Sequence, residues 1–184
     1  MLKWLQMLAE YNHWANERLY EASSKLSDTQ YREDRGAFFA SMHGTLNHLL
    51  IGDRIWLSRF VGGKNEPREL DGILFESFQD PWQARQQEDA RIKAYIASLD
   101  ERKLTATITY RTTRSPTIIE QELGPLLVHF FNHQTHHRGQ AHCILTGLTG
   151  EAPSLDLFVY QRETGDSIIK GHGNLSRAPE RRPG

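Results

Sequence analysis

The residues of this chain most suited to chemistry are two histidines, His133 and His137, four positions apart in a segment with helical periodicity. Residues i and i+4 of a helix project from one face about one turn apart, so both imidazoles can reach a common metal ion. Zinc-protease helices use the same spacing, with a glutamate directly after the first histidine. Here that position is Gln134. The motif therefore supplies ligands but no general base.

The buried face of this helix follows from counting about 100° per residue, starting at His129. His133 and His137 then lie at about 40° and 80°. The apolar positions of the helix lie between about 60° and 120°; they are Leu126, Phe130, Ala141, Ile144 and Leu148. Both histidines therefore belong to the apolar stripe. Buried imidazoles need partners for both ring nitrogens, so this pair either bonds to nearby polar groups or shares a metal.

The other polar residues of this helix are placed by the same count. His129 and His136 fall at the edge of the apolar stripe, and their roles stay open. Arg138 and His142 point to the opposite half. Cys143, the only cysteine, also lies off the histidine face, and we expect it to be a small buried residue without a metal-binding or nucleophilic role.

A third candidate ligand is His48, in a second segment with helical periodicity from about Gly36 to Phe60. It has Gly44 one turn before it and Gly52 one turn after. A glycine inside a helix costs roughly 1 kcal/mol against alanine, so this pair indicates either close helix packing or a cavity beside His48. His43 lies about 140° around the helix, so we expect it to have a structural or surface role.

Four long helices are predicted along the chain. The first carries an apolar stripe from Trp4 to Ala22, with His13 on the far side, and the second ends at Gly62-Gly63. The third runs from Asp80-Pro81 to about Leu99, and the fourth begins at Gly124-Pro125. β-branched residues at 105–110 and 117–121 predict a short hairpin before the last helix. We expect one domain over residues 1–163, closed by an apolar segment at 155–160, and a flexible tail over 164–184.

Composition excludes several classes of protein. The chain has 184 residues and a net charge of −1, from 22 Lys+Arg and 23 Asp+Glu, so no basic field draws it to nucleic acid. No stretch of about 18 apolar residues predicts a membrane helix. The N-terminus lacks a signal-peptide pattern, from which a cytoplasmic location is expected.

Four sequence pieces resemble the DinB/YfiT family of metal-binding four-helix bundles, and they occur in the family's order. They are residues 11–19 (YNHWANERL), 46–50 (LNHLL) with Asp53, Trp56 and Arg59, 132–140 (NHQTHHRGQ) and 155–157 (LDL). The resemblance covers roughly residues 1–162. It implies an all-α four-helix bundle with one divalent metal, nickel or zinc, held by His48, His133 and His137. Family members with a known activity include S-transferases and isomerases that use mycothiol, bacillithiol or glutathione, but many members have no known reaction.

Three neutral ligands leave the ion its full charge and at least one open position, as in catalytic sites. A low-molecular-weight thiol bound there would become the reactive thiolate and attack a small electrophile. Water in the same position would instead give metal-dependent hydrolysis. Asp53, Gln140 and Tyr11 are candidates for hydrogen bonds that support the ligands.

A non-catalytic alternative is a metal-stabilised dimeric bundle that binds a ligand or partner. A fourth ligand, for which His129, His136 or a neighbouring carboxylate are the candidates, would favour it, because structural metals usually have four protein ligands. The family resemblance and Trp14, on an aromatic surface of the first helix, predict a homodimer.

Overall fold

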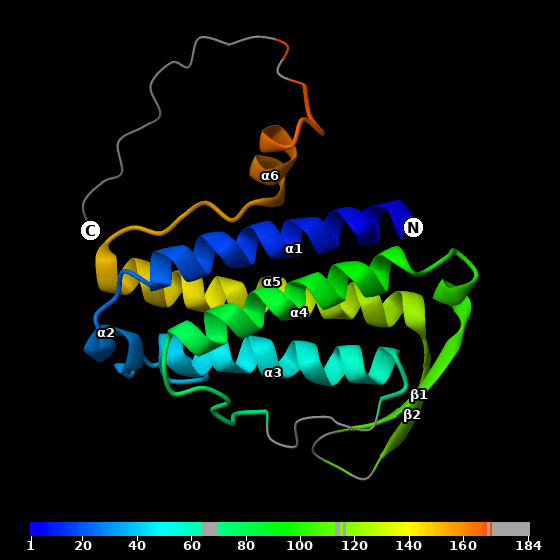
Figure 1. Cartoon of the computed structure of the whole chain (residues 1–184), viewed down its shortest axis with the longest axis horizontal. Helices are drawn as coiled ribbons and strands as arrows, with labels where there is room; N and C mark the ends of the chain where they lie inside the picture. Colours follow the sequence, from blue (N-terminus) through cyan, green and yellow to red (C-terminus); the bar gives the residue numbers. More distant parts are fainter. Residues whose placement is uncertain (64–69, 113–114, 116, 169, 171–184) are drawn as a thin grey trace.

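Four long helices form the body of the molecule in the computed structural model, which describes residues 1–63, 70–112, 115, 117–168 and 170. They are α1 (Leu2–Ser23), α3 (Met42–Phe60), α4 (Gln79–Ala97) and α5 (Leu123–Thr149). Figure 1 shows α1 and α5 running in one direction and α3 and α4 in the other. α1 packs on α4 and α5, and α3 packs on the same two helices. The predicted all-α four-helix bundle is confirmed.

The shorter elements lie at the ends and on one side of the bundle (Figure 1). They are α2 (Asp28–Arg32), the 3₁₀ helix Lys103–Thr105, strands β1 (Thr107–Arg111) and β2 (Ile118–Glu122), and α6 (Leu157–Glu163). β1 and β2 pair antiparallel, with Thr109 opposite Glu120, and form the hairpin predicted before the last helix. α6 packs on α1, as expected for the apolar segment after Gly150. Most of the predicted tail, residues 169 and 171–184, lies outside the described residues.

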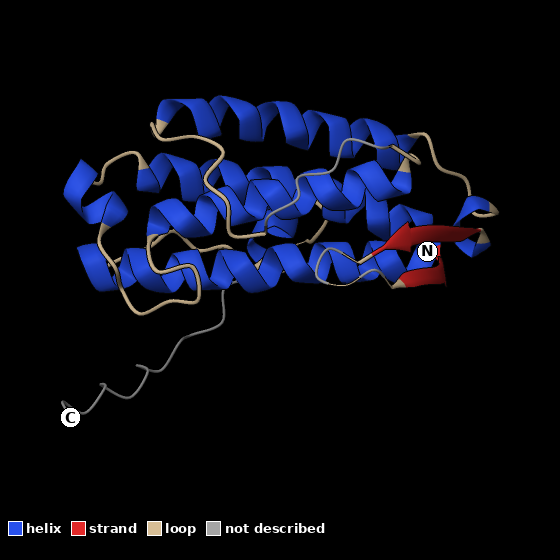
Figure 2. Cartoon of the chain, turned by 90° about the horizontal axis from the view of Figure 1, so that it is seen from below, coloured by secondary structure: helices blue, strands red, loops and turns tan. Residues whose placement is uncertain are grey.

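Because α3 and α4 run in the same direction, the chain must return along the bundle between them. Residues 70–78 belong to the described part of this crossover, and in the view from below they lie on the near side of the bundle, where α3 lies (Figure 2). α3 begins at the N-cap Ser41, whose side chain accepts a hydrogen bond from the Gly44 amide, and ends before Gly62 in a left-handed conformation.

Two apolar cores fill the bundle, one toward each end. The first contains Leu5, Ala9, Leu57, Phe60, Ile92, Ile96, Leu99, Leu104, Leu123, Leu126, Leu127, Phe130 and Phe131. The second contains Leu19, Tyr20, Tyr31, Met42, Leu46, Leu49, Ala141, Ile144 and Leu145. Near its middle, every long helix also carries buried polar residues: Asn12 and Asn16 on α1, His48 and Asp53 on α3, Arg85 and Asp89 on α4, and His137 and Arg138 on α5.

Six of these residues form what we call the polar layer: Asn12, Asn16, Asp53, Arg85, Asp89 and Arg138. Arg85 lies 2.5 Å from Asp53 Oδ2 and 2.9 Å from Asp89 Oδ1. The Asn12 and Asn16 amides donate to Asp89 Oδ1, and their carbonyls accept from Arg138 Nη1. Two guanidinium groups thus lie among two carboxyl groups and two carboxamides, so each buried ionisable group has a polar or charged neighbour.

The polar layer corrects two predictions. Arg138 was expected to point away from the core, but only 2% of its surface is exposed, because α5 packs on α1 as well as on α3. His13 was expected on the far side of its helix, but its Nδ1 lies 3.6 Å from the buried Asp89 carboxylate. That contact raises the pKa of His13. A helix between two neighbours buries two faces, and a single-stripe count identifies only one.

Other differences concern helix boundaries and exposure. α3 begins at Met42 rather than near Gly36, because Gly36 and Ala40 have φ values of 70° and 60° that no right-handed helix contains. α4 begins at Gln79, one residue before the predicted Asp80-Pro81 start, with Phe78 as N-cap. Cys143 is exposed, not buried, because it faces away from both neighbours of α5.

In the described part of the chain, no helix is both long and apolar enough to cross a membrane.

Candidate metal centre

The structure brings His48 of α3 and His133 and His137 of α5 together, and we call these three residues the histidine centre. His137 Nε2 lies 3.2 Å from His48 Nε2 and 3.1 Å from His133 Nε2. His48 and His137 are buried, with 5% and 8% of their surface exposed, and His133 is half-buried. Three ring nitrogens from two antiparallel helices therefore converge on one point. Such a group could hold a metal ion.

The tautomers of two rings follow from their outer contacts. His48 Nδ1 lies 2.7 Å from the Leu70 carbonyl oxygen, which can only accept, so this nitrogen carries the proton. His137 Nδ1 lies 2.8 Å from Gln140 Oε1 and donates to it in the same way. In a neutral imidazole the other nitrogen is then a bare acceptor. With the protons on Nδ1, the Nε2 atoms of His48 and His137 carry the lone pairs through which an imidazole binds a metal.

This arrangement fits a metal ion. For a metal–nitrogen distance of about 2.0–2.1 Å, two ligand nitrogens lie about 2.9 Å apart at 90° and about 3.4 Å apart at the tetrahedral angle. The observed separations of 3.1 and 3.2 Å lie inside this range. Metal-bound histidines typically donate their other N–H to a carbonyl or carboxylate, as His48 and His137 do to a backbone carbonyl and an amide oxygen.

At neutral pH, His133 and His137 are not protonated. Burial, followed by the neighbouring imidazoles of His137 and His48, lowers the pKa of His133 to about 3. Burial also lowers the pKa of His137, against the opposing effect of its bond to Gln140. Both rings therefore stay neutral, the form in which imidazole binds metals.

Gly52 positions His133 by having no side chain. A Cβ atom at this position would lie 2.9 Å from His133 Cε1, closer than real Cβ atoms approach a neighbour. The sequence left open whether Gly44 and Gly52 mark close packing or a cavity, and the structure shows close packing at both. At Gly44 a Cβ atom would lie 2.1 Å from the Phe39 carbonyl oxygen.

Asn47 holds the crossover against the histidine centre, a role that sequence reasoning missed. Its side chain is fully buried, and its Oδ1 accepts hydrogen bonds from the Leu74 and Phe75 amides at 2.9 and 3.1 Å. The same segment supplies the Leu70 carbonyl that accepts from His48. The Asn-His pair thus has two functions, one anchoring the loop and one facing the metal position. The sequence signal for this role was a polar residue, Asn47, directly before a candidate ligand.

Phe39 is a second contact that the sequence did not reveal. Its ring stacks on His48 with centroids 3.7 Å apart and planes at 17°, and it meets His137 edge-on at 5.5 Å. On the other side, His129 contacts His133 and Trp56, with ring centroids 5.9 and 5.0 Å apart. Aromatic rings therefore flank the histidine centre along the bundle.

The predicted supporting residues have different positions. Gln140 lies beside the centre: its Oε1 accepts from His137, and its amide nitrogen lies 3.4 Å from His136 Nε2. Asp53 instead pairs with Arg85 in the polar layer. Tyr11 donates to the Leu155 carbonyl at 2.6 Å, and its ring lies under Arg138.

The remaining histidines lie outside the centre. His129 and His136 are exposed and are not members of the convergent group. His43 is buried and bonds to the Phe75 carbonyl at 2.8 Å, consistent with a structural role. His142 bonds to the Pro153 carbonyl at 3.1 Å. Within the described residues, no group of histidines, cysteines or carboxylates other than His48, His133 and His137 converges in this way.

Comparison with known proteins relates this chain to one family and to relatives in sequence and in fold. The family model described as the DinB family matches residues 1–171. Protein DinB of Bacillus subtilis (strain 168) is 25% identical over 165 residues, which cover 85% of this chain and 94% of that protein. A crystal structure of a conserved protein from Enterococcus faecalis superposes with a TM-score of 0.63 at 16% identity, covering 79% of this chain and 97% of that one. At that identity the structural match shows the fold alone.

Proposed function

Because the chain belongs to the DinB family, we propose that its histidine centre binds one divalent metal, nickel or zinc, and that the protein is a metal-dependent thiol transferase. One observation carries the metal: ring nitrogens of His48, His133 and His137 converge, with His137 Nε2 lying 3.2 Å from His48 Nε2 and 3.1 Å from His133 Nε2. Imidazole suits several transition metals, so the ligands restrict the choice without deciding it.

Thiol transfer is supported by the number and type of ligands. Three neutral histidines leave the ion's charge uncompensated and a position open, whereas structural sites usually have four protein ligands. The ion would lower the pKa of a thiol placed there and so populate the thiolate at neutral pH. The substrates we propose are a low-molecular-weight thiol and a small electrophile.

The chain's own residues would hold this centre rigid. The Leu70 carbonyl and Gln140 Oε1 fix the orientation of two rings, and Gly52 leaves room for the third. Phe39 excludes water from one face of His48. No carboxylate belongs to the convergent group in the described chain, so no general base is assigned. A reaction that starts from a thiolate needs none for the attacking step.

The metal is tested by elemental analysis of protein purified without nickel resin. We expect one equivalent of metal in the wild type and none in the His48→Ala, His133→Ala and His137→Ala variants. His142→Ala is the matched control, because it removes a histidine of α5 that bonds to Pro153, and it should keep the metal. Full retention of metal in the His133→Ala protein would contradict the assignment.

The reaction is tested by incubating metal-loaded and metal-free protein with a panel of small thiols and electrophiles. We expect metal-dependent loss of free thiol together with loss of the electrophile. Metal-dependent release of acid from esters or amides without thiol loss would instead identify the hydrolase. A loaded protein that turned over nothing would favour the non-catalytic bundle.

We also propose that the protein is a cytoplasmic homodimer. Of the two sequence arguments for the dimer, the one from Trp14 no longer holds. The Trp14 ring is covered within the chain, because it packs on Tyr160 of α6 and its Nε1 donates to Glu163 at 3.0 Å. The dimer therefore rests on the family resemblance alone. Light scattering should give about twice the chain mass of 21.2 kDa, and a mass of one chain at micromolar concentration would reject the dimer.

A further inference from the structure

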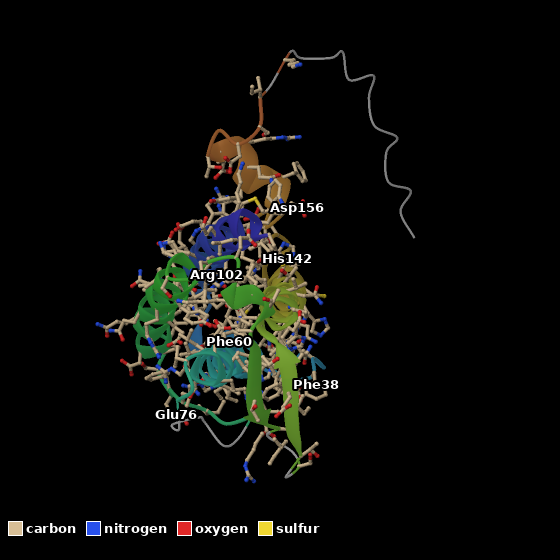
Figure 3. All side chains as sticks on the ribbon, turned by 90° about the vertical axis from the view of Figure 1, so that its right-hand side faces the viewer. Phe38, Phe60, Glu76, Arg102, His142 and Asp156 are labelled. Atoms are coloured by element: carbon tan, nitrogen blue, oxygen red, sulfur yellow. The ribbon has the colours of Figure 1, made fainter. Side chains whose placement is uncertain are left out.

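Phe38 and Phe39 form an aromatic surface beside the histidine centre, which we call the aromatic platform. Phe39 covers the His48 ring and touches the edge of His137. Phe38 meets Phe39 edge-on, with centroids 4.8 Å apart, and 72% of its own surface is exposed. In the view along the bundle, Phe38 lies at the periphery, whereas Phe60 lies inside (Figure 3). An apolar surface therefore continues from the ligand rings to solvent.

The turn that presents these rings is fixed by its own hydrogen bonds. The Ala40 amide donates to the Ala37 carbonyl at 2.8 Å and closes a turn with Phe38 and Phe39 at its tip. The Arg35 amide donates to the Ala40 carbonyl, also at 2.8 Å. The platform is thus held by backbone contacts on both sides and not merely by apolar packing.

Two features of the turn are unfavourable for folding, which suggests that they are kept for a function of the platform. Ala40 has a φ of 60°, a left-handed conformation that is unfavourable for a residue with a side chain. The Phe39 carbonyl lies where any side chain at position 44 would begin, so the turn restricts Gly44 to glycine. Strained positions that persist cluster at ligand-binding sites. Here the strained turn places the exposed Phe38 ring next to Phe39, which covers the candidate ligand His48.

We infer that the aromatic platform is a subsite for a flat apolar group, preferably aromatic, carried by the small molecule that occupies the open metal position. This inference rests on the proposed function, since it takes that position to accept a thiol. Stacked or edge-on contact with exposed Phe38 would desolvate both surfaces and orient the bound molecule. The platform would then select substrates by the group attached to the reacting atom.

The test uses the full-length protein loaded with Co²⁺ and two thiols, benzyl mercaptan and ethanethiol. Binding is followed by the thiolate-to-cobalt charge-transfer absorption, which needs no turnover. The measured quantity is the ratio of the two dissociation constants in each protein. Intrinsic differences between the thiols cancel when ratios are compared between variants.

Phe38→Ala should keep one equivalent of cobalt and reduce the preference for benzyl mercaptan by about three- to tenfold, the usual effect of one aromatic contact. Phe38→Tyr should keep the preference. Phe158→Ala is the matched control, because it removes a half-exposed phenyl ring from α6, which packs on α1 rather than on the histidine centre. It should leave the ratio unchanged.

An unchanged ratio in Phe38→Ala would overturn the subsite while leaving the thiol-binding metal intact. Equal losses in Phe38→Ala and Phe158→Ala would overturn it as well. If neither thiol bound to cobalt-loaded wild-type protein, the proposed function would fail and the subsite with it.

Discussion

The polar layer and the histidine centre are buried at the same level of the bundle, yet they satisfy their polar atoms in opposite ways. In the polar layer, Arg85 pairs with Asp53 and Asp89, and two asparagines link Asp89 to Arg138. Groups of opposite charge therefore lie within ion-pair distance of one another. In the histidine centre, ring nitrogens of three imidazoles converge instead. Burial alone therefore does not distinguish the two regions, whereas the kinds of groups that meet in them do: opposite charges in one, imidazoles alone in the other.

The two regions also differ in what the protein would lose without them. Removing one partner of a buried ion pair leaves an uncompensated charge, which destabilises the folded state. Removing one imidazole from a cluster of converging acceptors removes repulsion as well as packing. We therefore expect variants of the polar layer to affect stability and variants of the histidine centre to affect metal binding.

The largest effect on stability should come from Arg85→Ala, which leaves two buried carboxylates without their shared partner. We expect a loss of about 3–5 kcal/mol in the free energy of unfolding, measured by urea titration of metal-free protein. Arg102→Ala is the control, because this side chain is 95% exposed, and it should change stability by no more than about 1 kcal/mol. A loss in Arg85→Ala as small as that of the control would show that the polar layer does not stabilise the fold in this way. His133→Ala should cost the metal-free protein less than Arg85→Ala.

A smaller effect is expected from Gln140→Ala, which removes the acceptor for the outer proton of His137. Supporting residues of this kind typically contribute about 10–100-fold to metal affinity. Competition with a chromophoric chelator should show this loss, with the unfolding free energy nearly unchanged. Gln140→Glu restores an acceptor and should recover most of the affinity. Unaltered affinity in Gln140→Ala would show that His137 needs no such support.

Gly52→Ala tests, on α3, whether the histidine centre can lose metal affinity without losing stability. Its methyl group would displace the His133 ring, so we expect at least about a tenfold loss of metal affinity. Alanine also favours helix by roughly 1 kcal/mol, so stability should hold or rise slightly. Gly139→Ala provides the matched control, because nothing lies within 4 Å of its added Cβ atom. Equal metal affinities in the two variants would show that Gly52 does not position His133 for metal binding.

The positions of these residues were predictable to different degrees. The i, i+4 pair, the helical periodicity of both segments and the resemblance sufficed to identify His48, His133 and His137. The hairpin and the α3 end followed from β-branched runs and paired glycines. These signals are local, so a single sequence contains them.

Tertiary contacts account for what the sequence did not show. Asp53 and Tyr11 have the chemistry of supporting residues, but their helices turn them toward Arg85 and Leu155. Phe39 and the Leu70 carbonyl reach the centre through irregular segments, whose course no periodicity describes. Arg138 is buried by α1, a neighbour that a one-stripe count leaves out.

The smallest expected effect is a pH dependence in which the two regions act in opposite directions. The pKa of His133 in the folded protein is about 3, below its ordinary value, so the unfolded chain binds more protons as the pH falls below about 6.5. This residue therefore lowers the stability of metal-free protein in acid. Burial, which outweighs Arg85, raises the pKa of Asp53 to about 7, so Asp53 lowers stability as the pH rises from about 4 to 7.

Urea titrations at about pH 5 and 7 separate the two contributions. Metal-free His133→Ala should lose less stability on acidification than the wild type, by at most about 1.4 kcal/mol per pH unit. Identical changes in both proteins would show that His133 titrates normally in the folded state.

The most direct test of the central claim is the anomalous diffraction of a crystal of zinc-loaded protein, recorded at the zinc edge. The structure predicts one strong peak about 2.0–2.1 Å from the Nε2 atoms of His48, His133 and His137 together. A peak on the exposed His129 or His136, or no peak at the convergence of the three nitrogens, would contradict it.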